Sequence, residues 1–429
     1  MSQDTDELGI RQFATSPVTV VRQHVLGDDL LQHGSIIAIA TVASGALNYA
    51  FQVFMGRALG PEQYGVFGAL FALFYIVNVF GRGLRFSASR FTAELVGNGP
   101  ALASFHRKFL RQSMLFSIGI FVALVAAAPL LSDFLDVSTT LLVVAIAGTA
   151  PFGLALTVNF GTFQGVQWFT PLGGYKVLLA GVKLAAGVAL VVLGYGVFGA
   201  FAALILASVV VYGTTTIHLR RRLQAPLPSA STFDFSRAYR YTLPAILTGF
   251  CLTVPTTVDV ILAKHFFPSR LAGLYVAASV LGKILVFLPM GISTALFPKV
   301  STQQADESAT SELLTRAMFY TAVIAGLGTA TYWVLPEFVL TTFYGAAYAD
   351  AVPLLQWYGI SILVFALASV ILNFELARSR NRFVYVFTLI SVVEIALMGL
   401  FHASPLQFLH ILLLGNTALV VLGIIEVYS

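Results

Sequence analysis

The sequence predicts an all-α polytopic membrane protein with about twelve transmembrane helices. Of its 429 residues, 58% are hydrophobic and only 10% are charged, and the mean hydropathy is +0.87. Water-soluble domains carry about 25% charged residues, so the composition excludes a soluble globular protein. With spans of about 20 residues each, the chain has room for a dozen helices and for no large soluble domain.

Apolar stretches long enough to cross a membrane follow one another along the chain. In the first half we expect helices at 34–54, 64–84, 112–131, 139–160, 173–193 and 197–218. In the second half we expect helices at 241–263, 271–297, 313–334, 352–374, 383–401 and 405–427. Turn signals separate neighbouring stretches, among them LGPEQYG (59–65), GYG (194–196) and HASP (402–405).

The basic residues predict the orientation of these helices. Of the 24 Lys and Arg residues, 18 lie on one side of the predicted topology and three (Arg57, Lys264 and Arg270) lie on the other. Lys and Arg in short loops stay in the cytoplasm, which predicts a multi-pass protein of the cytoplasmic membrane with both termini in the cytoplasm. Topology thus explains the net charge of +5, and the basic pI does not predict binding to nucleic acid.

The two halves of the chain share a sequence pattern. A cation stands four residues before a proline in each half, at Arg57 and at Lys264, and Gln52 and Asp259 stand five residues before these cations. Later in each half, NFGTFQGVQWF (159–169) and NFELARSRNRF (373–383) share Asn-Phe and a second Phe ten residues after the Asn. Internal repeats in transporters place the binding site at the repeat interface.

The repeat predicts two pseudo-symmetric six-helix bundles around a central cavity. We expect a cytoplasmic N-terminal arm at 1–33, a first bundle at 34–218 and a second bundle at 241–429. The polar residues 219–240 are predicted to be a cytoplasmic linker between the bundles.

Three segments resemble a known family. FMGRALGPEQYGVFGALFAL (54–73) resembles the opening signature of polysaccharide and lipid-linked oligosaccharide flippases, which belong to the multidrug/oligosaccharidyl-lipid/polysaccharide (MOP) exporter superfamily. LAGLYVAASVLGKILVFLPMGISTALFPKVS (271–301) is similar to the eighth helix of the family, and FYGAAYADAVPLLQWYGI (343–360) resembles its outer loop after helix nine. The resemblance implies a V-shaped pair of bundles whose cavity opens alternately to the two sides. It also implies a substrate that is a polyprenyl or dolichyl (pyro)phosphate glycan.

Two lysines near the middle of predicted spans are the strongest candidates for substrate binding. Lys183 and Lys283 are too deep to reach the membrane surface easily, and ionisable residues inside a membrane mark functional sites. A lysine in the cavity offsets the charge of a phosphate. The alternative for Lys283 is a buried structural ion pair, for instance with Asp259.

A second group of candidates lies on the first two predicted helices. Arg82 and Arg85, with Asn78 one turn earlier, form one stripe that could collect phosphate at the inner mouth. The alternative is that the two arginines extend to cytoplasmic lipid headgroups. Asn48 and Gln52, one turn apart, are predicted to face either substrate or a partner helix.

Two acidic residues in the second half are candidates for ion coupling. Asp259 lies in the predicted seventh helix and Glu394 in the eleventh. The alternatives are an ion pair for Asp259 and a neutral, hydrogen-bonded state for Glu394. The coupling ion, Na⁺ or H⁺, and a role of the membrane potential remain open. The sequence has no HExxH motif, P-loop or Cys/His cluster, and its single cysteine, Cys251, excludes an intramolecular disulfide. We therefore expect no metal site and no cofactor.

These observations predict a flippase for polysaccharide or glycoprotein biosynthesis, not an enzyme. Its expected partners are the lipid-linked glycan, membrane lipid and glycosyltransferases of the same pathway, and we expect a monomer. One alternative is a cation-coupled multidrug exporter of the same superfamily, but the cations inside predicted spans argue against cationic drugs. A membrane glycosyltransferase or polymerase is the weaker alternative, since the predicted outer loops leave little room for a catalytic domain.

The predicted topology can be tested with reporter fusions. Fusions after residues 33, 228 and 429 are all expected to report the cytoplasm, because the 18-to-3 distribution of Lys and Arg holds all three positions on that side. The measurement is the ratio of a cytoplasmic to an external reporter activity. An external signal at any of the three positions contradicts twelve spans with both termini inside.

Overall fold

The computed structural model describes residues 17–223, 234–254, 256–302, 307–378 and 382–428, and its regular elements in these ranges are all helical. The predicted arm 1–33 and linker 219–240 lie partly outside the described residues. The first elements are α1 (Pro17–Leu95), α2 (Gly99–Ala126), α3 (Ala128–Phe134), α4 (Thr140–Ala147), α5 (Ala150–Gly165), α6 (Phe169–Leu190), η1 (Val191–Tyr195) and α7 (Gly196–Arg222). Then follow α8 (Phe235–Thr253), α9 (Val258–Phe266), α10 (Ser269–Thr302), α11 (Glu307–Val334), α12 (Pro336–Tyr344), η2 (Ala346–Ala351), α13 (Val352–Ala377), α14 (Arg382–Leu400) and α15 (Pro405–Tyr428).

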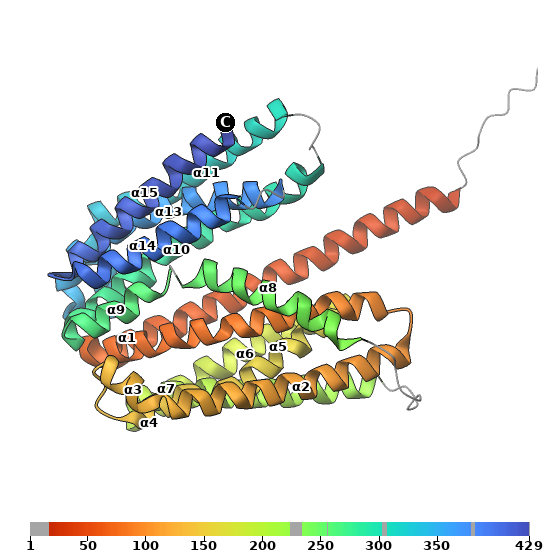
Figure 1. The fold of residues 1–429 in the computed structure, drawn as a ribbon, viewed down its shortest axis with the longest axis horizontal. Coiled ribbons are helices and arrows are strands. Elements are labelled where there is room, and N and C mark those ends of the chain that lie inside the picture. The colour runs from red at the N-terminus through yellow and green to blue at the C-terminus, as the bar shows by residue number, and fades with distance from the viewer. Residues whose placement is uncertain (1–16, 224–233, 255, 303–306, 379–381, 429) are drawn as a thin grey trace, which may run out of the picture.

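The helices form two lobes. In Figure 1, α1 to α7 make one lobe and α9 to α15 make the other; the lobes meet around α9 and diverge toward the opposite end. One hydrophobic core continues across the meeting point, where Phe51 and Phe67 of α1 belong to the same cluster as Tyr275 of α10 and Tyr358 of α13. The expected all-α, two-lobed architecture is confirmed.

Glycines divide the longest helical stretches. Within α1, Gly60 has φ 70°, a conformation that glycine adopts without a steric penalty, and Pro61 then begins the second half with a backbone angle suited to a first helical turn. The loop expected at 55–63 is therefore reduced to one residue. Gly194 (φ 92°) and Gly196 (φ 51°) likewise separate α6 from α7, which confirms the predicted GYG turn.

By length and composition, nine stretches of the described residues could cross a membrane. Two of them, 61 and 54 residues long, contain the Gly60 and the Gly194–Gly196 breaks, and each is long enough for two crossings of about 20 residues. The predicted seventh span, 241–263, is not among the nine. The total of twelve crossings stays a prediction.

The predicted seventh span is not one continuous helix. α8 ends at Thr253 and α9 begins at Val258. α8 lies along α1 (Figure 1), where the rings of Phe80 and Phe250 are 5.2 Å apart. α9 packs against α10 and α14 of the other lobe and also against α1, so this segment passes from one lobe to the other at the place where the lobes meet. The expected bundle boundaries at 218 and 241 stay a prediction.

The two lobes cross closely where α1 meets α10. A Cβ atom on Gly65 would lie 2.9 Å from the backbone nitrogen of Gly273, and a Cβ atom on Gly273 would lie 2.6 Å from the carbonyl carbon of Pro61. Both distances are shorter than van der Waals contact. Only glycine at both positions allows this approach.

Tyrosines form the polar part of the same contact between lobes. Tyr348 donates a hydrogen bond of 2.6 Å to the carbonyl oxygen of Gly56, and the hydroxyls of Tyr64 and Tyr344 are 3.3 Å apart. All three rings are buried. The residues that follow Gly345 are thereby held against α1 of the first lobe.

The Gly65–Gly273 crossing can be tested by enlarging one glycine. Gly273→Ala is expected to destabilise the protein by about 1–3 kcal/mol, because the added methyl group overlaps the backbone at Pro61. The control is Gly326→Ala in α11, where nothing lies within 4 Å of an added Cβ atom. The measurement is the melting temperature of each purified variant in detergent. Equal melting temperatures for the two variants would contradict the close crossing.

Candidate functional site

Lys183, which is half-buried, and Asn48, which is exposed, meet between α6 and α1 of the first lobe. Lys183 of α6 donates a hydrogen bond to the Asn48 side-chain oxygen on α1, and its Nζ atom lies 4.6 Å from the ring centre of Phe51. A ring face attracts a cation through its quadrupole. Lys183 makes no ion pair with a carboxylate in the part of the chain that the structure describes, so neutral groups alone stabilise its positive charge.

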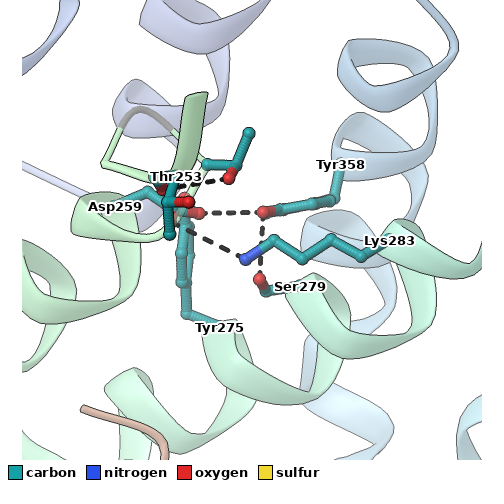
Figure 2. A network of polar contacts seen from close by, with 7 residues as sticks. Thr253, Asp259, Tyr275, Ser279, Lys283 and Tyr358 are labelled. Atoms are coloured by element: carbon teal, nitrogen blue, oxygen red, sulfur yellow. Dashed lines mark hydrogen bonds and ion pairs between the residues drawn. The ribbon is translucent and has the colours of Figure 1, made fainter. Parts of the chain in front are cut away.

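Lys283 and Asp259 meet inside the second lobe, as Figure 2 shows. The Asp259 side chain is 1% exposed, and its Oδ1 atom lies 3.9 Å from Lys283 Nζ. Its Oδ2 atom accepts hydrogen bonds from Tyr275 (3.2 Å) and Tyr358 (2.8 Å). The Tyr358 hydroxyl accepts in turn from Ser279 Oγ at 2.9 Å. Asp259 thus has a cation on one oxygen and two hydroxyl donors on the other, as the alternative interpretation of the sequence predicted.

A small cavity of about 20 Å³ adjoins this pair. That volume holds roughly one water molecule. Glu394 of α14 is buried and faces the cavity, and its Oε1 atom has no hydrogen-bond partner. The polar side chains of the lining are Thr256, Asp259, Lys283, Tyr358, Ser361, Ser391, Glu394 and Asn416.

The chemistry of this lining favours a small hard cation. Carboxylate, hydroxyl and amide oxygens are the ligands that such cations prefer. Asn416 donates to the Ser361 backbone oxygen and hydroxyl at 3.2 and 3.1 Å, which leaves its own amide oxygen as an acceptor. Among the described residues, no group of three or more His, Cys, Asp or Glu could hold a metal ion, and this lining contributes two acidic side chains, Asp259 and Glu394.

The two arginines predicted at the inner mouth point to different helices. Arg82 donates to Thr253 Oγ1 at the end of α8, at 3.1 Å. Arg85 donates two hydrogen bonds, of 3.2 and 3.0 Å, to Gln164 Oε1 on α5. Arg82 therefore joins α1 to the segment that passes between lobes, and Arg85 stays within the first lobe.

The remaining candidates bond locally. The Asn78 side chain donates to the Phe74 carbonyl oxygen of its own helix at 2.8 Å, and Gln52, also on α1, is half-buried. The structure thus brings sequence candidates together in two separate groups, Lys183 with Asn48, and Lys283 with Asp259 and Glu394. It does not gather all of them into one site.

Sequence reasoning missed several residues of these sites. Tyr275 and Tyr358 donate to Asp259 from positions 16 and 99 residues away, and no local pattern identifies such partners. Asn416 could have been found, because it stands alone among apolar residues in the stretch LLLGNTALV (412–420). Phe51, which faces Lys183, carries no sequence signal that separates it from other core aromatics.

The fold matches solved structures of MOP-superfamily transporters. An inward-facing multidrug resistance MATE transporter matches with a TM-score of 0.79 at 15% identity, over 90% of this chain and 94% of that one. The lipid II flippase MurJ, in an inward closed conformation, gives 0.74 at 16% identity, over 92% and 87%. A MOP transporter from Pyrococcus furiosus, described by the reverse polarity of its binding pocket, gives 0.60 at 16% identity, over 93% and 94%. With an outward-facing MATE structure the TM-score is 0.64.

These matches define the class as a membrane protein with the fold of MOP transporters. Residues 54–353 match the polysaccharide biosynthesis protein family. The match covers more than half of the chain, and the protein belongs to this family. No curated protein sequence is detectably similar to it. The resemblance inferred from the three sequence segments is confirmed.

The two lysines differ in a way that stability measurements can detect. Lys283→Gln leaves the buried Asp259 carboxylate without its cation, which is expected to cost about 3 kcal/mol. Asp259→Asn in the same chain is expected to restore most of that loss. Lys183→Gln is the matched control, since its partner Asn48 is neutral and no charge is stranded.

The measurement is thermal unfolding in detergent without Na⁺, with choline as the cation. If Lys283→Gln and Lys183→Gln lower the melting temperature equally, the ion pair with Asp259 does not stabilise the fold.

Proposed function

We propose that the protein is a flippase that moves a polyprenyl or dolichyl (pyro)phosphate-linked sugar or oligosaccharide across the cytoplasmic membrane, for polysaccharide or glycoprotein biosynthesis. The observation that carries the proposal is Lys183, an ammonium group in the middle of a span that neutral groups alone stabilise. A charge held inside a membrane protein without a carboxylate can stabilise an anionic ligand. Family membership and the fold shared with the lipid II flippase MurJ support the same substrate class.

The substrate's chemistry explains why two lobes are useful. A sugar headgroup cannot cross hydrocarbon without hydrogen-bond partners, because each unsatisfied polar group costs several kcal/mol there, roughly 4–8 in the least polar reference solvents. The isoprenoid tail needs no such path and stays in the lipid. We infer that the head passes between the lobes while the tail remains at their side.

We propose that the lobes work by alternating access and that the arrangement of Figure 1 is the one that loads from the cytoplasm. Two observations support this. The lobes meet around α9 (Figure 1), which carries Lys264, and Arg57 of α1 donates to the Thr342 carbonyl oxygen of α12 in the second lobe; both cations are on the predicted outer side. The TM-score is also higher with an inward-facing than with an outward-facing MATE structure, 0.79 against 0.64. Both termini would then lie in the cytoplasm.

The cavity beside Asp259 is proposed as the site of the coupling ion, with Na⁺ as its occupant. Asp259 and Glu394 supply two carboxylates from different helices, and Ser361 and Asn416 supply neutral oxygens. Each lobe would thus bind a different ligand: the first lobe would bind the anionic substrate at a basic site, and the second would bind the cation at an acidic site.

A multidrug exporter is the second candidate, favoured by the TM-score of 0.79 with a MATE transporter. Export of cationic drugs requires acidic or aromatic groups at the substrate site, whereas Lys183 is basic. The flippase therefore remains the better proposal. Glycosyltransferases of the same pathway are the proposed partners, with the chain acting as a monomer and without nucleic acid.

Removal of the Lys183 charge tests the flippase proposal. Lys183→Gln is expected to reduce translocation of lipid-linked glycan about 10- to 100-fold, because one hydrogen bond to a charged group contributes about 1.5–3 kcal/mol. Lys183→Arg is expected to retain part of the activity, since it keeps the charge. The control is Lys108→Gln, which removes an exposed cation from α2.

The measurement is the glycan that becomes accessible on the outer face, normalised to folded protein in the membrane. Unchanged translocation by Lys183→Gln would contradict a role for this lysine in substrate binding. Efflux of cationic dyes by the wild-type protein, without glycan translocation, would favour the exporter.

A further inference from the structure

The contact between Lys283 and Asp259 is loose for a buried ion pair. Lys283 Nζ lies 3.9 Å from Asp259 Oδ1, beyond hydrogen-bond distance, which for charged groups is about 2.7–2.9 Å. Asp259 Oδ1 accordingly has no hydrogen-bond partner, although the residue is only 2% exposed. The carboxylate therefore has an unfilled coordination position beside the ammonium group.

A second unfilled oxygen faces the same cavity. Glu394 is 5% exposed, and its Oε1 atom also lacks a partner. The cavity between the two carboxylates, of about 20 Å³, has room for one small occupant. Lys283 is the one cationic residue that lines this cavity within the described part of the chain. It pairs with Asp259 from one edge and leaves the cavity itself open.

We propose that Lys283 is a displaceable cation, which holds Asp259 when the ion cavity is empty and leaves it when Na⁺ enters. This proposal rests on the proposed coupling site and adds its regulation. Na⁺ in the cavity and an ammonium at Asp259 would be two positive charges a few ångströms apart in a low-dielectric interior, where they repel strongly. Asp259 therefore pairs with one of the two at a time.

The position of Lys283 allows this exchange. Its side chain is 28% exposed while that of Asp259 is 1% exposed, so the ammonium group lies at the boundary of the buried cavity. Its long side chain enters from α10, as Figure 2 shows, and can turn away without moving the helix. Nζ is 6.0 Å from the ring centre of Tyr358, a neutral group that can continue to attract it.

Displacement would link the ion to the substrate. The Lys283 ammonium group, once released from Asp259, no longer has a carboxylate to offset its charge. It then becomes a second cation, in addition to Lys183, that an anionic headgroup can contact. Binding of Na⁺ in the second lobe would then raise the affinity for the phosphate. By thermodynamic linkage, the phosphate would raise the affinity for Na⁺ by the same factor.

Binding of ²²Na⁺ to the purified full-length protein in detergent tests the exchange. Lys283→Gln removes the competitor and is expected to lower the Kd for Na⁺ at least tenfold. Lys108→Gln, which removes an exposed lysine of α2, is expected to leave this Kd unchanged. Lys283→Arg keeps a competing charge and is expected to bind Na⁺ no more tightly than the wild type.

A second measurement uses the wild-type protein and covers the case in which Lys283→Gln does not fold. Acylation of Lys283 by an amine-reactive ester, followed by peptide mass spectrometry, is expected to increase severalfold when Na⁺ replaces choline. Lys183 in the same sample is the internal control. In Asp259→Asn, Lys283 is expected to react to the same extent in both salts.

The outcomes are distinct. Displacement is overturned if the Kd for Na⁺ of Lys283→Gln is unchanged or higher, or if no variant binds ²²Na⁺. It is also overturned if the extent of Lys283 acylation is the same in Na⁺ and in choline. Neither measurement uses a glycan. If the flippase assay fails but Lys283→Gln binds Na⁺ more tightly, the proposed glycan substrate is refuted, whereas the exchange of Lys283 for Na⁺ at Asp259 is supported.

Discussion

The cost of placing charge inside a membrane protein is the constraint on which this structure depends. Each buried charge must meet an opposite charge, several dipoles or a ligand. Lys183 meets an amide oxygen and an aromatic ring, and Asp259 meets two hydroxyls and a loosely held ammonium. Neither group is fully compensated by protein. Such residues destabilise the folded protein. An anionic substrate at Lys183 and a small cation at Asp259 are the ligands that would offset this destabilisation.

The break between α8 and α9 is a second consequence of the same constraint. Two of the polar contacts described above lie on the two sides of this break, at the end of α8 and at the start of α9. Thr253, the last residue of α8, accepts from Arg82 of the first lobe, and Asp259, in the first turn of α9, pairs with Lys283 of the second. In a continuous helix, the 3.6-residue period would fix the angle between the Thr253 and Asp259 side chains. The break allows each lobe to keep its own polar contact.

Composition and spacing predicted much of this fold, because long apolar stretches have few alternatives in a membrane. The ranges expected for α13, α14 and α15 agree with the structure within three residues, and the glycines of GYG mark the break before α7 as expected. The division of α8 from α9 was missed although TVPTT (253–257) contains a proline, because apolar residues on both sides satisfied a span-length window. For the site, a repeat pattern indicated Asp259 and span depth indicated Lys283. Their tyrosine partners depend on tertiary packing that a single sequence does not encode locally.

The contact between the lobes and the proposed ion cavity share one helix, α10. Gly273 lies at the close crossing with α1 and Lys283 lies at the cavity, ten residues further along α10, a separation of about 15 Å along a helix. The crossing depends on backbone contact, and the hydroxyls beside it, Tyr64 and Tyr344, can exchange each other for water when the lobes separate. A helix transmits a change at one of its ends to the other without bending much. Asp259 therefore contacts the same helix that holds the predicted outer ends of the lobes together, and this would place the proposed ion binding and the proposed lobe opening under one mechanical constraint.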